Sequence, residues 1–154
     1  MQNIFETNSE YVAETKPRVL IIEDDPEFSY YLKIIFEDCG CSTMIASDGI
    51  KGYKAIKSFE PDLITLDLLL PNKTGIQLFR QLRKHSKFHS IPIIVITSYS
   101  ENNYPMLDIK KKLYSSKIIP PEAFFEKPVE SRELLLAVQR ILGFTNYKTR
   151  RTGL

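Results

Sequence analysis

Cysteine is scarce in this chain of 154 residues, which contains only Cys39 and Cys41. The two are separated by one residue where a predicted helix ends and a strand begins, so we expect no disulfide between them. A metal site would need further ligands, and none lies nearby in the sequence. We therefore expect two reduced, partly buried thiols, as in a protein of the cytoplasm. A chain of this length can fold without disulfides or a structural metal.

Long apolar runs and an excess of one charge are also missing. No segment approaches the roughly 18–20 consecutive apolar residues that span a bilayer. Residues 1–16 hold three Glu and no apolar stretch of the kind found in secretory signals. The formal net charge is only +2, which disfavours a dedicated nucleic-acid-binding protein. These absences predict a cytoplasmic, globular protein that binds neither nucleic acid nor membrane.

The two ends of the chain differ from its middle. Residues 1–16 are mostly polar, show no periodicity and carry a net charge of −2, which predicts a mobile N-terminal tail. Residues 143–154 contain three basic residues and no acid, which predicts a basic C-terminal tail. The remaining residues, 17–142, are predicted to form one domain. Because only 12 residues follow it, we expect no attached output domain.

Short apolar runs alternate in the middle of the chain with segments whose apolar residues recur at helical spacing. Asp25 is a predicted N-cap with Pro26 in the first helical position, and Gly40 ends the same helix. The alternation predicts parallel strands joined by right-handed crossovers and covered on both faces by helices. The predicted strands are 18–24, 41–46, 62–70, 91–97 and 123–126, and the predicted helices are 26–39, 48–59, 75–84, 105–114 and 131–142.

Polar residues gather at the carboxyl ends of four predicted strands, which is where open α/β sheets bind ligands. The acidic residues 23–25 close the first strand, Asp67 lies within the third, Thr97 ends the fourth and Lys127 follows the fifth. Asp67 is the most informative, because an acid within an apolar strand loses hydration unless it is paired or bound to a cation.

Each of these residues has a plainer interpretation when taken alone. The acidic residues 23–25 could be a solvated helix cap, Lys127 a surface residue and Thr97 a filler on the strand. Together they form an oxygen-rich site of the type that Mg²⁺ prefers, with a hydroxyl and an ammonium beside it. This combination predicts that the Asp67 carboxylate accepts a phosphoryl group, while Mg²⁺, lysine and threonine neutralise the transferring oxygens.

Four segments form a specific pattern: VLIIEDDP (19–26), LDLLLPNKTG (66–75), IIVITS (93–98) and FFEKPV (124–129). Together they resemble the receiver domain of two-component response regulators. The resemblance covers roughly residues 17–142 and implies a flavodoxin-like (βα)5 fold, an α/β doubly wound parallel five-stranded sheet of order 2-1-3-4-5. It implies a phosphoacceptor switch rather than an enzyme, which signals through protein–protein contacts to an unknown downstream protein. The implied donor is a sensor histidine kinase or a histidine phosphotransfer protein, and the implied cofactor is Mg²⁺.

The resemblance also implies roles for individual residues. Asp67 corresponds to the phosphoacceptor, Thr97 to the switch hydroxyl and Lys127 to the family's lysine. Phe124, three residues before the lysine, corresponds to the switch aromatic and here lacks a phenolic hydroxyl. Within the family's acidic pair, the second residue is implied as the direct metal ligand. The implied Mg²⁺ ligands are Glu23, Asp24, Asp67 and the backbone carbonyl of Leu69.

Neighbouring residues complete the resemblance. Asp25 falls one position past the acidic pair and is interpreted as the helix cap. Pro128 implies a cis peptide bond with Lys127, as the family has. Pro71 and Gly75 correspond to the loop after the phosphoacceptor.

One segment departs from the family pattern. The chain needs 30 residues to pass from the switch hydroxyl to the lysine, several more than usual, and the usual small Gly-rich turn is missing. The segment 98–123 contains three lysines at 110–112, for which a solvated helix face is favoured over a binding site for an acidic partner. Leu69 and Tyr99 occupy variable positions near the site. Their size predicts hindered access of water and a longer-lived phosphate.

Two other functions compete with the phosphotransfer switch. A phosphohydrolase of the haloacid-dehalogenase type also uses an Asp nucleophile with Mg²⁺ and Lys, but it normally has a second Asp two residues later, where this chain has Leu69. A receiver-like scaffold that only binds partners is the third possibility. The complete set of site residues disfavours it, while the lengthened segment leaves it open.

Overall fold

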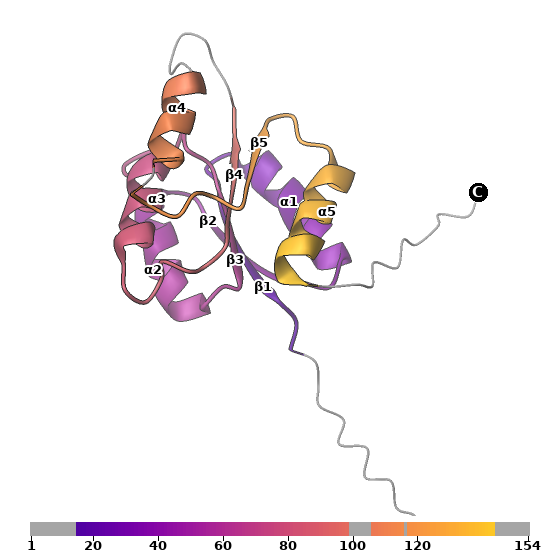
Figure 1. Cartoon of the computed structure of the whole chain (residues 1–154). Helices are drawn as coiled ribbons and strands as arrows, with labels where there is room; N and C mark the ends of the chain where they lie inside the picture. The colour runs from indigo at the N-terminus through magenta and orange to yellow at the C-terminus, as the bar shows by residue number, and fades with distance from the viewer. Residues whose placement is uncertain (1–14, 99–105, 116, 144–154) are drawn as a thin grey trace, which may run out of the picture.

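The computed structural model describes residues 15–98, 106–115 and 117–143, which form a five-stranded parallel sheet between two helical layers (Figure 1). The strand order β2-β1-β3-β4-β5 confirms the predicted 2-1-3-4-5 order. The strands are β1 (Arg18–Ile22), β2 (Ser42–Ala46), β3 (Leu63–Leu66), β4 (Ile93–Thr97) and β5 (Ala123–Glu126). The helices are α1 (Pro26–Asp38), α2 (Gly49–Phe59), α3 (Gly75–Lys84), α4 (Met106–Leu113) and α5 (Ser131–Leu142).

The sheet has a separate apolar core on each face, because successive side chains of a strand point to opposite sides. On β1, Val19 and Ile21 pack with residues of α1 and α5, while Leu20 and Ile22 pack with residues of α2, α3 and α4. Figure 1 shows the same division, with α1 and α5 on one side of the sheet and the other three helices opposite. Both faces of the central strands are therefore covered, as their unbroken apolar runs predict.

The third strand is shorter than predicted. The apolar run 62–70 predicts one continuous strand that contains Asp67, but β3 ends at Leu66 and Asp67 is the first residue after it. The prediction was wrong because it took every residue of the apolar run to belong to a strand. Leu68 and Leu70 are buried, but they lie in the loop before α3. Burial alone does not distinguish strand from loop. Smaller differences trim the first, second and fourth predicted strands at their ends.

The caps of the helices fix the loops that carry the polar residues. Asp25 caps α1, with its Oδ1 accepting hydrogen bonds from the backbone N–H groups of Glu27 at 2.9 Å and Phe28 at 3.2 Å, and Pro26 opens the helix as predicted. Gly40, just past the C-cap, adopts a φ of +94° that favours glycine. Only two residues separate the last position of β1, Ile22, from the helix cap, Asp25, so the acids 23–25 are held at the edge of the sheet.

The lengthened segment before β5 is held by a buried cation. The side chain of Arg83 on α3 is completely buried and pairs with Glu122 at 3.0 Å, directly before β5 begins. The predicted fourth helix, 105–114, corresponds to α4 at Met106–Leu113, and residue 105 lies outside the described residues. None of the described helices combines the length and apolar character that crossing a bilayer requires.

Candidate functional site

The structure brings the predicted site residues together at the carboxyl edge of the sheet. Glu23 follows β1, and its backbone N–H donates to the carbonyl of Ala46 on β2 at 3.0 Å. Asp67 follows β3, and its backbone N–H donates to the carbonyl of Ile22 at 3.0 Å. The sheet pairing therefore extends one step past the strands and places both acids on its rim. Both are buried, with Glu23 3% and Asp67 5% exposed.

The carboxylate of Asp67 is held at both of its oxygens. Oδ1 accepts hydrogen bonds from the Thr97 hydroxyl and from the backbone N–H of Leu69, each at 3.0 Å. Oδ2 accepts a hydrogen bond from the Lys127 ammonium at 3.0 Å. The donors come from the end of β4, from the loop after β3 and from the residue after β5, so three segments of the chain orient one carboxylate.

Lys127 links the two buried acids. Its ammonium lies 2.7 Å from Glu23 Oε2 and 3.0 Å from Asp67 Oδ2. The same nitrogen lies 4.3 Å from the ring centroid of Phe28, a cation–π arrangement that the sequence interpretation missed. Sequence interpretation gives Phe28 no role at the site. Its position in the first turn of α1, next to the acidic residues, is the signal that could have indicated its place at the site.

Burial and mutual charge set the protonation of these groups. Burial raises the pKa of Glu23 to about 7, with the charge of Asp67 adding to the rise and the hydrogen bond from Lys127 opposing it. Burial acts to lower the pKa of Lys127, but its interactions with Glu23 and Asp67 outweigh this effect and raise the pKa. The lysine therefore remains an ammonium, while the acid beside it holds its proton more tightly than an exposed glutamate.

The donor set fits a hard divalent cation. One carboxylate oxygen from each of Glu23, Asp24 and Asp67 lies within 4.8 Å of the others. Asp24 is exposed, so a cation that reaches it can retain water molecules. When ionised, the three carboxylates outnumber the single ammonium of Lys127 and leave an excess of negative charge. Several carboxylate oxygens beside open solvent are the environment in which proteins bind Mg²⁺.

The loop after Asp67 approaches the site closely at one glycine. Gly75, the first residue of α3, donates its N–H to the carbonyl of Leu68 at 3.1 Å. A Cβ atom at this position would overlap the carbonyl oxygen of Asp67 and crowd the Cα atom of Leu68. Only glycine fits here without moving the backbone that carries the carboxylate.

The two residues with an expected switch role lie on neighbouring strands. Thr97 ends β4 and is 1% exposed, and its carbonyl accepts a hydrogen bond from the backbone N–H of Lys127 at 2.9 Å. Phe124 on β5 is half-buried against the core beneath α2, α3 and α4, and the ammonium of Lys110 lies 5.4 Å from its ring centroid. Leu69 is half-buried beside the site, and Tyr99 lies outside the described residues.

The remaining predictions at this edge concern local geometry. The Lys127–Pro128 peptide bond is cis, as the sequence predicts. The lysines 110–112 are all exposed on α4, in keeping with the expectation of a solvated helix face. Pro71 is exposed in the loop between Asp67 and Gly75.

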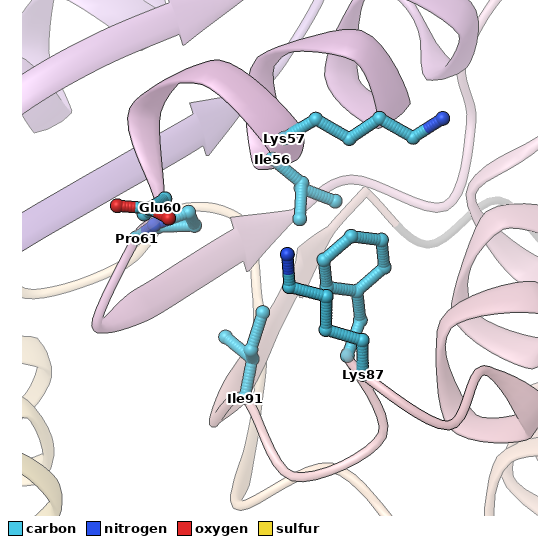
Figure 2. Close-up of a pocket in the computed structure, with 7 residues that line it drawn as sticks. Ile56, Lys57, Glu60, Pro61, Lys87 and Ile91 are labelled. Carbon is cyan, nitrogen blue, oxygen red and sulfur yellow. The ribbon is translucent and has the colours of Figure 1, made fainter.

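A pocket of about 160 Å³ lies at the opposite edge of the sheet, between the end of α2 and the segments before β3 and β4 (Figure 2). Figure 2 shows Ile56 and Ile91 on either side of it and the side chain of Lys57 extending away from it. Its lining is Ile56, Lys57, Glu60, Pro61, Lys87, Phe88 and Ile91. The lining holds one carboxylate among apolar and basic side chains, so it does not bring several reactive groups together. The candidate site is therefore the one at the carboxyl ends of the strands.

Comparison with known proteins gives one family. The sequence model described as response regulator receiver domain matches residues 19–139. The chain is 32% identical over 130 residues to the DNA-binding dual master transcriptional regulator RpaA of Synechocystis sp., covering 84% of this chain and 51% of RpaA. It is 28% identical over 133 residues to hybrid signal transduction histidine kinase D of Dictyostelium discoideum, covering 86% of this chain and 8% of the kinase. The chain thus spans about half the length of RpaA and a small part of the kinase.

Solved structures agree with the sequence comparison. The signal receiver domain of a signal transduction histidine kinase from Syntrophus aciditrophicus is 28% identical, with a TM-score of 0.71, covering 89% of this chain and 95% of that one. A response regulator receiver domain protein (CheY-like) from Methanospirillum hungatei JF-1 is 25% identical, also with a TM-score of 0.71, covering 84% of this chain and 95% of that one.

Proposed function

Because the chain belongs to the family of response regulator receiver domains, we propose that Asp67 is its phosphoacceptor. Receiver domains are signalling switches of two-component systems rather than classical enzymes. The observation that carries the assignment is the carboxylate of Asp67, buried at the carboxyl edge of the sheet and held by Thr97 and Lys127. The hydrogen bonds from Thr97 and Lys127 compensate the burial of this carboxylate, and the same two donors could bind the oxygens of a phosphoryl group.

The donor is a phosphohistidine on a sensor histidine kinase or on a histidine phosphotransfer protein, the partners from which receiver domains accept phosphoryl groups. A carboxylate oxygen of Asp67 attacks phosphorus, the P–N bond breaks, and its electron pair returns to the imidazole nitrogen, which takes up a proton. The Asp67 carboxylate is already oriented by three donors in the structure. The Thr97 hydroxyl and the Lys127 ammonium then lie within reach of phosphoryl oxygens.

Glu23, Asp24, Asp67 and the backbone carbonyl of Leu69 are the residues that we propose to hold Mg²⁺. The cation neutralises charge on the transferring phosphoryl oxygens when it is bound. Glu23 has a second part in the site, because its hydrogen bond to Lys127 at 2.7 Å holds the ammonium beside Asp67. Asp24 is the exposed member of the set and faces the solvent from which the cation arrives.

The signal leaves through the neighbouring strands. Transfer draws the Thr97 hydroxyl from Asp67 Oδ1 toward a phosphoryl oxygen, which opens space between β4 and the helices. Phe124 pairs with Val95 in the adjacent strand and is only half-buried, so it is free to reorient toward that space. The Lys110 ammonium lies over the Phe124 ring and would move with it. The position of this positive charge on the face of α4 that meets a downstream protein would then change.

The test is phosphorylation by a small phosphodonor with Mg²⁺, measured on a phosphate-retarding gel. Wild type should shift, and Asp67→Asn should not. The matched control is Asp38→Asn, which removes the same charge from an exposed position at the end of α1 and should shift like wild type.

Each of the other outcomes contradicts the proposal. A shift that persists in Asp67→Asn would place the phosphoryl group elsewhere. A folded wild type that never shifts would favour the binding scaffold, and sustained turnover of many unrelated phosphoesters would favour a phosphohydrolase.

A further inference from the structure

The two cysteines of the chain lie in contact at the edge of the sheet opposite to Asp67. Cys39 is the C-cap of α1, and Cys41 directly precedes β2. Their sulfur atoms are 3.7 Å apart, and both are free thiols. Cys39 is half-buried and Cys41 is 3% exposed. The pair therefore has one member that a small solute can reach and one that it cannot.

The end of α1 brings the two thiols together. The backbone N–H of Gly40 donates to the carbonyl of Glu37, and that of Cys41 donates to the carbonyl of Phe36, each at 3.0 Å, so the chain reverses tightly at the glycine. Gly40 has a φ of +94°, and apart from Gly40 and its two chain neighbours no atom lies within 4 Å of the place where a Cβ would stand. The glycine that links the two cysteines is thus not packed against the rest of the fold on that side.

The environment makes the two thiols chemically different. The hydrogen bond with Cys41 lowers the pKa of the Cys39 thiol, although burial acts in the opposite direction. The same hydrogen bond and burial raise the pKa of the Cys41 thiol. Cys39 is consequently the better nucleophile, because the thiolate is the reactive form. Cys41 remains a protonated thiol placed directly beside it.

A metal site is a weaker explanation for this pair. Within residues 15–98, 106–115 and 117–143, the single group of three or more His, Cys, Asp or Glu side chains close enough to share a metal is Glu23, Asp24 and Asp67. Two thiols without a third ligand are poorly suited to a structural or catalytic zinc site. Two thiols in contact can, by contrast, be oxidised to a disulfide, and the 3.7 Å between the sulfur atoms argues against the expectation from their spacing that they would not pair.

We propose that Cys39 and Cys41 form an oxidative modification site whose co-substrate is a small hydroperoxide such as hydrogen peroxide. The Cys39 thiolate attacks one peroxide oxygen, the O–O bond breaks, and the leaving hydroxide takes up a proton to give water and a sulfenic acid. The Cys41 sulfur then attacks the Cys39 sulfur, the S–O bond breaks, and the oxygen leaves as a second water with the Cys41 proton. The sulfur atoms close from 3.7 Å to the disulfide distance of about 2.05 Å.

The product ties the end of α1 to the start of β2 through the Gly40 turn. A thiol reductant reverses it by exchange, which returns both thiols and oxidises the reductant. The two cysteines lie at the amino ends of the strands, whereas Asp67 lies at the carboxyl ends. Oxidation and the proposed phosphorylation therefore use separate groups and fail or succeed independently.

Intact-mass measurement tests the proposal directly, because the chain has only these two cysteines. After a brief treatment with hydrogen peroxide, a monomer should lose the mass of two hydrogen atoms. When it is then denatured, it should lack both of the sites that iodoacetamide labels in denatured, untreated protein. Dithiothreitol should restore both. Cys39→Ser should react at least roughly tenfold more slowly than wild type. Cys41→Ser should stop at a sulfenic acid that dimedone captures.

Three results would overturn the proposal. The first is wild type that proceeds to sulfinic acid without losing two hydrogens, and the second is a disulfide-linked dimer on a non-reducing gel. The third is a Cys39→Ser variant that reacts as fast as wild type. The wild-type measurement alone decides the first two, so the proposal stays testable even if a serine variant folds poorly.

Discussion

Replacing Arg83 with methionine should lower the free energy of unfolding by about 3 kcal/mol. The guanidinium is completely buried, and burial acts to lower its pKa while the charge of Glu122 opposes this. It joins α3 to the segments before β4 and β5 through five acceptors. These acceptors are the carbonyls of His89, Ile91, Ile119 and Pro120 at 2.7–3.2 Å and the Glu122 carboxylate at 3.0 Å.

The magnitude follows from what the substitution leaves behind. Methionine keeps an apolar stem against the ring of Phe79, over which the guanidinium lies at 5.1 Å. Removing one partner of a buried ion pair costs roughly 3–5 kcal/mol. The Glu122 side chain is 30% exposed, so water can partly replace the lost donors and the lower value applies. For a domain of this size the loss corresponds to a fall in Tm of roughly 6–12 °C.

Urea unfolding of wild type and variants measures the effect. The matched control is Arg80→Met, on the exposed side of the same helix, which should change stability by no more than about 0.5 kcal/mol. Glu122→Gln should cost only about 1–2 kcal/mol, because the amide oxygen still accepts from the guanidinium and from the backbone N–H of Ile93. If Arg83→Met and Arg80→Met unfold at the same urea concentration, Arg83 does not hold this segment and the reasoning is refuted.

Two further predictions concern the site itself. Gly75→Ala should slow phosphorylation of Asp67 several-fold and destabilise the fold by about 1–3 kcal/mol, because the new methyl displaces the Asp67 carbonyl; wild-type values for both the gel-shift rate and the urea midpoint would contradict the packing argument. Without Mg²⁺, stability should fall as pH rises from about 4.5 to about 7, because folded Glu23, with a pKa of about 7, binds a proton that the unfolded chain has released. The loss is on the order of 3 kcal/mol. Glu23→Gln should flatten this part of the curve, and equal slopes in the two proteins would show that Glu23 is not the group responsible.

The order and type of the elements could be predicted because each leaves a local pattern. Apolar runs without alternation indicate strands buried on both faces, and Asp25 with Pro26 marks where α1 begins. The end of β3 could not be predicted in the same way. Leu68 and Leu70 are buried although they lie in a loop, so their apolar character fits a loop as well as a strand. Where β3 ends depends on where α3 packs against the sheet.

The composition of the site was also predictable. Parallel strands present their carboxyl ends at one edge, so Glu23, Asp67, Thr97 and Lys127 were expected to meet, and they do. Their roles in phosphoryl transfer stay predictions until the gel-shift assay is done. Phe28 left a weaker signal, its place in the first turn of α1 beside the acids, and its contact with the Lys127 ammonium could not be predicted because the two residues are far apart in the chain.

By itself the sequence determined the α/β class, the edge of the sheet at which the candidate site lies and the residue types that meet there. These depend on the periodicity and order of segments along the chain, which are local, and on the general rule that parallel strands end at one edge of a sheet. The tertiary structure alone decided that one ammonium is shared between Glu23 and Asp67, and that Arg83 holds the long segment before β5. Both arrangements join residues far apart in the chain, and their energies depend on which partners meet in the interior, which no local pattern specifies.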